Sequence, residues 1–216
     1  MSLRSVTAAA LAVAVAGCGI NSVPTAEEKV NARWADVQND YQRRADLIPN
    51  LVSTVKAAGA QEKNILVEVT QARAGANAVT VSPEELSDPN KLRQYERAQN
   101  NVSLSLQRMQ EAYPELKSQG NYTTLMSQLE GTENRIAVAR RDYNERVRDY
   151  NTTLRTFPSV IWAKTVQSSS KPMQLFQAAA TSQSAPTVDF GVPGAAPGSA
   201  PPVGPAPSAV PATPAQ

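Results

Sequence analysis

Apolar and aromatic residues recur every three or four positions through most of the region between residues 25 and 157. This spacing is typical of the buried face of an α-helix, and no stretch alternates as a half-buried strand would. Glycines, prolines and short polar stretches divide the pattern into four helical stripes. The first stripe consists of Val30, Trp34, Val37, Tyr41, Ala45, Ile48, Val52 and Val55.

Local signals predict where the first three helices begin. Thr25 and Glu28 have the spacing of a capping box, in which a hydroxyl and a carboxylate satisfy the first free N–H groups, so the first helix is expected to begin there. The second helix is expected over residues 60–79. The third begins either after Ser82, with a proline at its first position, or later, after Asp88.

The third stripe ends before Pro114, and the fourth helix follows a polar turn near Gly120 and stops at residues 157–158. The third stripe consists of Leu92, Tyr95, Gln99, Val102, Leu106, Met109 and Tyr113, and Gln99 is its one polar member. The fourth consists of Leu125, Leu129, Ile136, Ala139, Tyr143, Val147, Tyr150 and Leu154. Four amphipathic helices with short connections favour an all-α, elongated antiparallel four-helix bundle.

Pro49 lies inside the first stripe, where it cannot donate an N–H to the carbonyl of Ala45. The first helix is therefore expected to be kinked there, or to restart with Asp46 as its N-cap. Arg43 and Arg44 stand beside this point. They are expected to brace the free carbonyl or to pair with acids of the fourth helix. Together with Asp46 and Pro49 they form a candidate structural or partner-docking site, and a ligand site is a further alternative.

The N-terminus has the features of an exported lipoprotein. Residues 1–17 carry an early arginine and a short apolar run, too short to span a bilayer, as in a signal peptide. The run ends in Val-Ala-Gly-Cys, which resembles the lipobox of bacterial lipoproteins, so Cys18 is predicted to be lipidated and to anchor the chain to a membrane. Residues 18–24 then serve as a linker to the bundle, residues 25–157.

Two further segments follow the predicted bundle. Residues 158–177 form a C-terminal apolar segment, which is expected to cap the bundle or to touch the lipid interface near Cys18. Residues 178–216 are rich in proline, alanine, serine and glycine, a composition that cannot bury enough apolar surface to fold, and they are predicted to be a disordered tail.

Two stretches resemble the LemA family of bacterial envelope proteins: NARWADVQNDYQRRADLIPNLVSTVKA and LEGTENRIAVARRDYNERVRDYNTTLRTFPS. With the intervening AYPELKS, the similarity covers roughly residues 28–159. The resemblance implies a helical, antiparallel bundle attached to a membrane, with no established enzymatic activity. Familiar members look to be held by an N-terminal transmembrane helix and to end soon after the FPS segment. Here Cys18 takes the place of that helix, and the proline-rich tail is extra.

Composition argues against several classes of function. The chain has 21 Lys and Arg against 19 Asp and Glu, so it lacks the basic excess expected of a nucleic-acid-binding protein. It has no histidine, and its single cysteine is the predicted lipidation site. Ser-His-Asp and Cys-His catalysis are thereby excluded, and we expect no enzymatic activity, no metal and no cofactor.

The sequence therefore favours a lipid-anchored adaptor or scaffold of the bacterial envelope that binds a membrane or periplasmic protein. If the cell is Gram-negative, Gly19 after the cysteine favours the periplasmic face of the outer membrane. An alternative is an envelope sensor with a small-ligand cavity opened at Pro49 and lined by Arg43, Asp46 and Tyr143. A third hypothesis is a mechanical spacer whose tail touches the cell wall.

Overall fold

The computed structural model describes residues 19–59 and 62–177, and within these ranges it contains five α-helices, two 3₁₀ helices and no strand. The all-helical prediction is confirmed. The elements are α2 (Ser22–Ala57), α3 (Lys63–Ala78), η1 (Pro83–Ser87), α4 (Pro89–Ala112), η2 (Pro114–Ser118), α5 (Gly120–Thr153) and α6 (Ser159–Thr165). The predicted signal peptide, Cys18 and the predicted tail over residues 178–216 lie outside the described residues.

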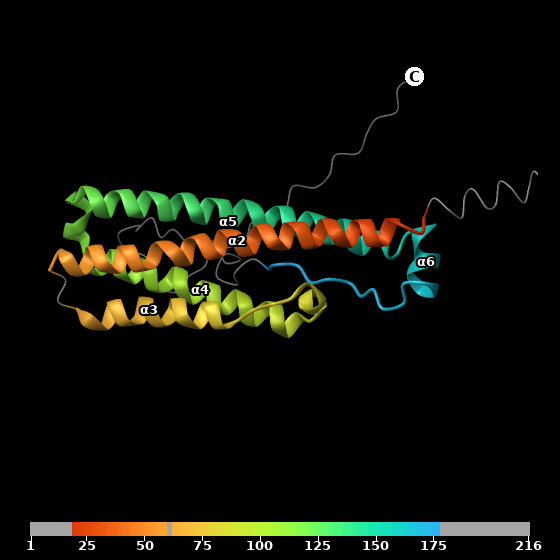
Figure 1. Ribbon diagram of the computed structural model, residues 1–216, viewed down its shortest axis with the longest axis horizontal. Helices are drawn as coiled ribbons and strands as arrows, with labels where there is room; N and C mark the ends of the chain where they lie inside the picture. Colours follow the sequence, from red (N-terminus) through yellow and green to blue (C-terminus); the bar gives the residue numbers. More distant parts are fainter. Residues whose placement is uncertain (1–18, 60–61, 178–216) are drawn as a thin grey trace, which may run out of the picture. The chain divides into compact units, whose positions relative to one another are not determined.

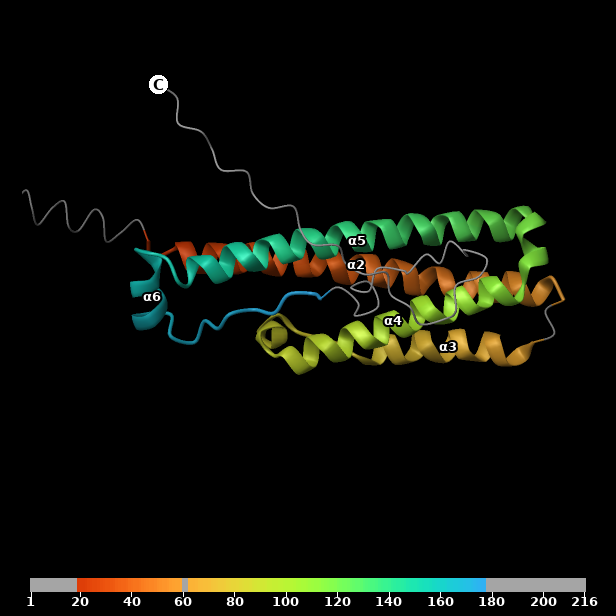
Figure 2. The same cartoon turned by 180° about the vertical axis from the view of Figure 1, so that it is seen from behind.

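The two long helices, α2 and α5, lie side by side and run in opposite directions (Figure 1). The shorter helices α3 and α4 form a second antiparallel pair along the half of α2 and α5 remote from α6, as the view from behind also shows (Figure 2). In the other half, residues 171–177 run beside α5 in their place. The helix α6 lies across the end of the molecule where α2 begins.

The first helix begins earlier than its apparent capping box predicted. Its N-cap is Asn21, whose carbonyl accepts a hydrogen bond from the Thr25 N–H at 3.0 Å. Pro24 therefore stands in the first turn, where N–H groups have no intrahelical partner and a proline costs nothing in hydrogen bonding. The prediction of a start at Thr25 and Glu28 was wrong, and α2 takes in part of the predicted linker, residues 18–24.

The two alternative starts of the third helix are both used, by different elements. Ser82 caps the short 3₁₀ helix η1, and its N–H donates to the Glu85 carboxylate at 3.1 Å. The chain then becomes extended at Asp88, whose carboxylate caps α4 by accepting from the N–H of Asn90 at 2.8 Å. The helix α4 ends at Ala112, before Pro114 as predicted, because the residue preceding a proline is disfavoured in a helix.

Buried apolar residues form two clusters along the molecule. One surrounds Trp34 and Tyr143 near the α6 end, and the other surrounds Leu51 and Met109 toward the connection between α2 and α3. Every predicted apolar residue of the first stripe is buried. Between Tyr41, in the first cluster, and Ile48, in the second, α2 places a buried arginine.

Candidate functional site

The four predicted site residues lie on different sides of α2. Only 2% of Arg44 is exposed, whereas Arg43, Asp46 and Pro49 are on the outer surface. Successive residues of a helix are turned by about 100°, and Arg44 is seven residues before the fully buried Leu51, so it shares the inner face. The structure therefore does not bring the four residues together into one site.

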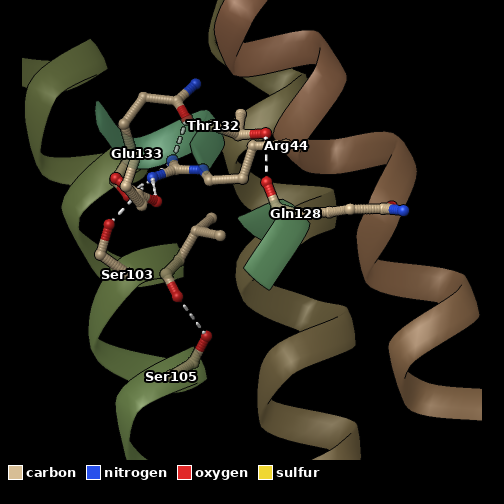
Figure 3. A network of polar contacts seen from close by, with 8 residues as sticks. Arg44, Ser103, Ser105, Gln128, Thr132 and Glu133 are labelled. Atoms are coloured by element: carbon tan, nitrogen blue, oxygen red, sulfur yellow. Dashed lines mark hydrogen bonds and ion pairs between the residues drawn. The ribbon is translucent and has the colours of Figure 1, made fainter. Parts of the chain in front are cut away.

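The guanidinium of Arg44 joins three helices. Its Nη1 donates to the Glu133 carboxylate of α5 at 2.7 Å and to the Ser103 hydroxyl of α4 at 2.9 Å, as Figure 3 shows. Its Nη2 donates to Gln99 twice, to the backbone carbonyl at 3.0 Å and to the side-chain oxygen at 2.7 Å. The guanidinium carbon also lies 5.0 Å from the centre of the Tyr41 ring. Arg44 is thus the centre of a polar layer between the two apolar clusters.

These contacts explain how a charge is accommodated in the core. A buried cation is tolerated only when it has a counter-ion and acceptors for its donors. Arg44 has Glu133 as its counter-ion, and each of its Nη atoms donates two hydrogen bonds. Its counter-ion, Glu133, has 42% of its side chain exposed and lines a surface groove of about 540 Å³ between α4 and α5. Two other buried hydroxyls in this region, those of Ser105 and Thr132, donate to carbonyls of their own helices (Figure 3).

Burial shifts the pKa of the phenols that lie beside the arginine layer. Burial raises the pKa of the Tyr41 phenol, and the positive charges of Arg140 and Arg44 oppose that shift. Burial likewise raises the pKa of Tyr95, whose ring lies 5.5 Å from that of Tyr41. Both phenols are therefore neutral near pH 7, and the Arg44 charge is balanced by Glu133 alone among the described groups that contact it.

The carbonyl left free by Pro49 is satisfied from another helix. The Nε of Arg73, in α3, donates to the Ala45 carbonyl at 2.6 Å. The brace expected from Arg43 or Arg44 is therefore supplied by a residue that the sequence did not single out. Since α2 is continuous from Ser22 to Ala57, it does not restart at Asp46; the kink at Pro49 stays a prediction.

The cavity predicted by the small-ligand alternative is not formed by its expected residues. Arg43 and Asp46 are exposed on α2, and the Asp46 carboxylate accepts a hydrogen bond from Gln42 of the same helix at 2.7 Å. Tyr143 is fully buried in the aromatic cluster near the α6 end, where its hydroxyl donates to the Gln174 carbonyl at 3.0 Å. Because Arg43 and Asp46 face the solvent and Tyr143 lies in the core, these three residues do not line one pocket.

The residues that follow Cys18 are held against α6. A Cβ atom on Gly19 would come within 3.1 Å of the Trp162 ring, so any other residue here would need the ring to shift by a few tenths of an ångström. The Ser22 hydroxyl donates to that of Ser159 at 2.8 Å. The same end exposes a group of apolar side chains, which we call the α6 apolar patch: Ile20, Phe157, Ile161 and Val166. Phe157 is the most exposed, at 74%.

Two further properties concern the described ranges 19–59 and 62–177. No helix there has the length and hydropathy needed to span a bilayer. No three histidine, cysteine, aspartate or glutamate side chains in that part of the chain are grouped as metal ligands would be.

Comparison with known proteins supports the resemblance seen in the sequence. The model of the LemA family matches residues 33–190. The match continues well past the FPS segment and includes α6 and residues 171–177, so these belong to the family's domain. No curated protein matches the chain. Since the family match covers more than half of the 216 residues, the chain belongs to the LemA family.

Proposed function

We propose that this protein is a lipid-anchored, non-enzymatic adaptor or scaffold that binds a membrane or periplasmic protein. Membership of the LemA family indicates a bacterial envelope-associated protein. In the proposal, the helices act as an elongated four-helix bundle, bent at Pro49 and attached to the membrane by lipid on Cys18. The bundle then presents the outer faces of its helices to a partner.

The main support for this proposal comes from the end of the bundle where α6 lies. Gly19, the residue after Cys18, packs on Trp162, so a lipid on Cys18 would bring this end to the membrane surface. The α6 apolar patch is exposed at that end, and Lys164 is exposed beside it. Apolar side chains flanked by a basic residue suit the boundary between acyl chains and anionic headgroups, which supports an orientation with α6 toward the bilayer.

Partner binding is supported by the outer surface of α2 and α5. A groove of about 440 Å³ between these helices has a charged rim that includes Arg33, Asp36 and Arg135, and 47% of the apolar Val138 is exposed in it. Mixed charge around an apolar centre is typical of protein interfaces. On the same helix as Arg33, Arg43 and Asp46 are exposed, whereas Arg44 is enclosed by its own partners and is not accessible.

Crosslinking in intact cells, followed by purification of the tagged chain, tests the proposal. We expect a reproducible protein partner that is lost in Arg43→Glu and retained in Arg148→Glu, a matched charge reversal at an exposed arginine of α5. Arg44 is unsuitable because its substitution disturbs the core. Recovery of no partner from the wild-type chain, or equal recovery with Arg43→Glu, would contradict the proposal.

A further inference from the structure

Residues 171–177 run in an extended conformation (Figure 2). The helix α5 binds their backbone with two asparagine side chains. The Asn151 amide donates to the Met173 carbonyl at 2.9 Å and accepts from the Met173 N–H at 2.9 Å. The Asn144 amide repeats this arrangement with Phe176, at 3.0 Å and 2.9 Å. Each asparagine thus satisfies both backbone groups of one residue of the segment.

Gln174, the residue after Met173, is also bound through its backbone. The Gln174 N–H donates to the Leu86 carbonyl of η1 at 2.9 Å, and its carbonyl accepts from the Tyr143 hydroxyl at 3.0 Å. These groups come from two different elements, so the backbone of the segment lies in a cleft between η1 and α5. None of the contacts requires a particular side chain on the segment.

The end of the segment is held in the same way. The Gln177 N–H donates to the Glu96 carboxylate of α4 at 3.1 Å, and its carbonyl accepts from the Arg140 guanidinium at 3.3 Å. Glu96 and Arg140 also pair with each other at 3.2 Å, which fixes both groups in position. We call the surface formed by Leu86, Glu96, Arg140, Tyr143, Asn144 and Asn151 the backbone-reading groove.

Only two side chains of the segment are deeply buried. Met173 is 7% exposed and Phe176 is 5% exposed, while Leu175 between them points outward. The Phe176 ring lies 5.3 Å from that of Tyr143, and the Arg140 guanidinium lies 4.6 Å above it. The groove therefore selects for an apolar residue followed three positions later by an aromatic one. Among the other positions, the Gln174 side chain adds one hydrogen bond, from its amide to the Ser87 carbonyl at 3.4 Å.

The spacing of the asparagines matches an extended chain. Asn144 and Asn151 are seven residues apart on a helix, a distance of about 10.5 Å at 1.5 Å per residue. Met173 and Phe176 are three residues apart in an extended chain, a distance of about 10 Å at 3.3 Å per residue. Because this register depends on backbone repeats and not on the sequence, other extended peptides can occupy it.

We propose that the backbone-reading groove is a peptide-binding site, which takes an extended segment of a partner protein with an apolar residue and an aromatic residue three positions apart. The chain's own residues 171–177 occupy the groove when the partner is absent. This proposal rests on the adaptor function and names the chemistry of its partner. Main-chain hydrogen bonds provide the affinity and two side-chain pockets the specificity, as in other modes of peptide recognition.

The connection that leads into the segment leaves room for its exchange. The segment is connected to α6 by residues 166–170, which are not helical and are largely exposed. Its advantage over an external peptide is mainly its local concentration, which for a short tether is on the order of millimolar. A partner segment with the same pattern, brought close by docking elsewhere on the bundle, removes that advantage.

Peptide exchange in the purified full-length chain tests the proposal. A protease site is inserted between the exposed Ser169 and its neighbour Ser170, and binding of a fluorescent KPMQLFQ peptide is followed by anisotropy before and after cleavage. We expect saturable binding after cleavage and at least tenfold weaker binding to the uncut chain. A peptide with alanine in place of phenylalanine should bind at least tenfold more weakly than KPMQLFQ.

The asparagines provide the matched controls. Cleaved Asn144→Ala/Asn151→Ala should bind the peptide at least tenfold more weakly than the cleaved parent, because two pairs of hydrogen bonds are lost. Cleaved Asn134→Ala, at an exposed asparagine of α5 outside the groove, should bind like the parent. Equal binding by all three cleaved chains would overturn the proposal.

An uncut Met173→Ala/Phe176→Ala chain gives a second route, because its weakened segment should admit the wild-type peptide. Unfolding of both the cleaved chain and this variant would overturn the proposal, since a segment that the fold cannot release cannot be exchanged. A dimer of the uncut wild-type chain that excludes the peptide would also overturn it, by showing that a second copy fills the groove. These results come from purified protein, so they are separable from the cellular crosslinking at Arg43.

Discussion

Arg73 of α3 donates a hydrogen bond at 2.6 Å to the backbone carbonyl of Ala45 in α2, and this carbonyl is the acceptor that Pro49 deprives of its intrahelical donor. The contact replaces a lost bond within one helix by a bond between two helices. It therefore lets α2 continue through the proline with its buried face in phase, and it ties α3 to the middle of α2.

Double-mutant analysis of this pair gives the first prediction. Arg73→Ala is expected to lower the free energy of unfolding by about 2 kcal/mol, because a partly buried carbonyl loses a charged donor. In a Pro49→Ala background the cost should fall by about 1 kcal/mol, since the substituted alanine supplies the missing N–H. Urea denaturation of the four chains measures the coupling. Identical costs in the two backgrounds would show that Pro49 and Arg73 act independently.

The adjacent arginines of α2 give the second prediction. Arg44→Ala should lower the free energy of unfolding by about 3 kcal/mol, because it leaves a cavity and removes the donors that Gln99 accepts from. Arg44→Lys should recover only part of this loss, since an ammonium cannot reproduce the planar fork of donors. Arg43→Ala is the matched control and should change stability by less than about 0.5 kcal/mol. Comparable losses at both positions would refute the buried assignment of Arg44.

The buried phenols give the third prediction, a loss of stability in alkali. Burial raises the pKa of Tyr41, Tyr95 and Tyr143 above the ordinary value of 10.0. The stability that these neutral phenols contribute is complete below pH 10, and it is lost as the pH rises from 10 through the raised values, because the unfolded chain releases its protons first.

Denaturation at increasing pH, together with the absorbance of tyrosinate, checks this prediction. The three phenols should ionise together with unfolding, and Tyr95→Phe should make the decline of stability above about pH 10 less steep. Ionisation of all three near the ordinary pKa of 10.0 in a chain that keeps its helical circular dichroism would be inconsistent with their burial.

The helices and their buried faces could be predicted because they depend on periodicity. The stripe of α4 is buried throughout, including Gln99, its one polar member. On α5 the prediction missed Thr132, which is fully buried because its hydroxyl donates to the Gln128 carbonyl of its own helix. Leu125, predicted to face the core, is only partly buried. Near the start of α5, Tyr122 and Met126 provide the buried face instead.

The polar layer was partly visible in the sequence. Arg44 stands seven residues after Val37 and seven before Leu51, which is the periodic signal of the buried face, and Gln99 interrupts an otherwise apolar stripe. A polar residue is unusual on the buried face of a helix, and the hydrogen bond from Arg44 to the Gln99 side chain explains why both are found there. Periodicity could not identify the pair, because it fixes the face of one helix and not the register between helices.

The contacts of Arg73 and of residues 171–177 could not be predicted in this way. Arg73 lies on a weakly patterned helix, and its acceptor is a backbone carbonyl 28 residues earlier. The extended segment has no helical period, and its binding depends on Asn144 and Asn151, whose polar side chains read as ordinary surface residues. Long-range backbone recognition leaves little trace in the pattern of apolar residues.

The central proposal is that lipid attached to Cys18 anchors the helical bundle to a membrane, with its α6 end toward the bilayer. Metabolic labelling with an alkyne analogue of palmitate, applied to bacterial cells that produce the full chain or Cys18→Ala, tests it most directly. We predict that the wild-type chain carries the label and sediments with membranes, and that Cys18→Ala carries none and is released. Label on Cys18→Ala, or an unlabelled wild-type chain, would contradict the proposal.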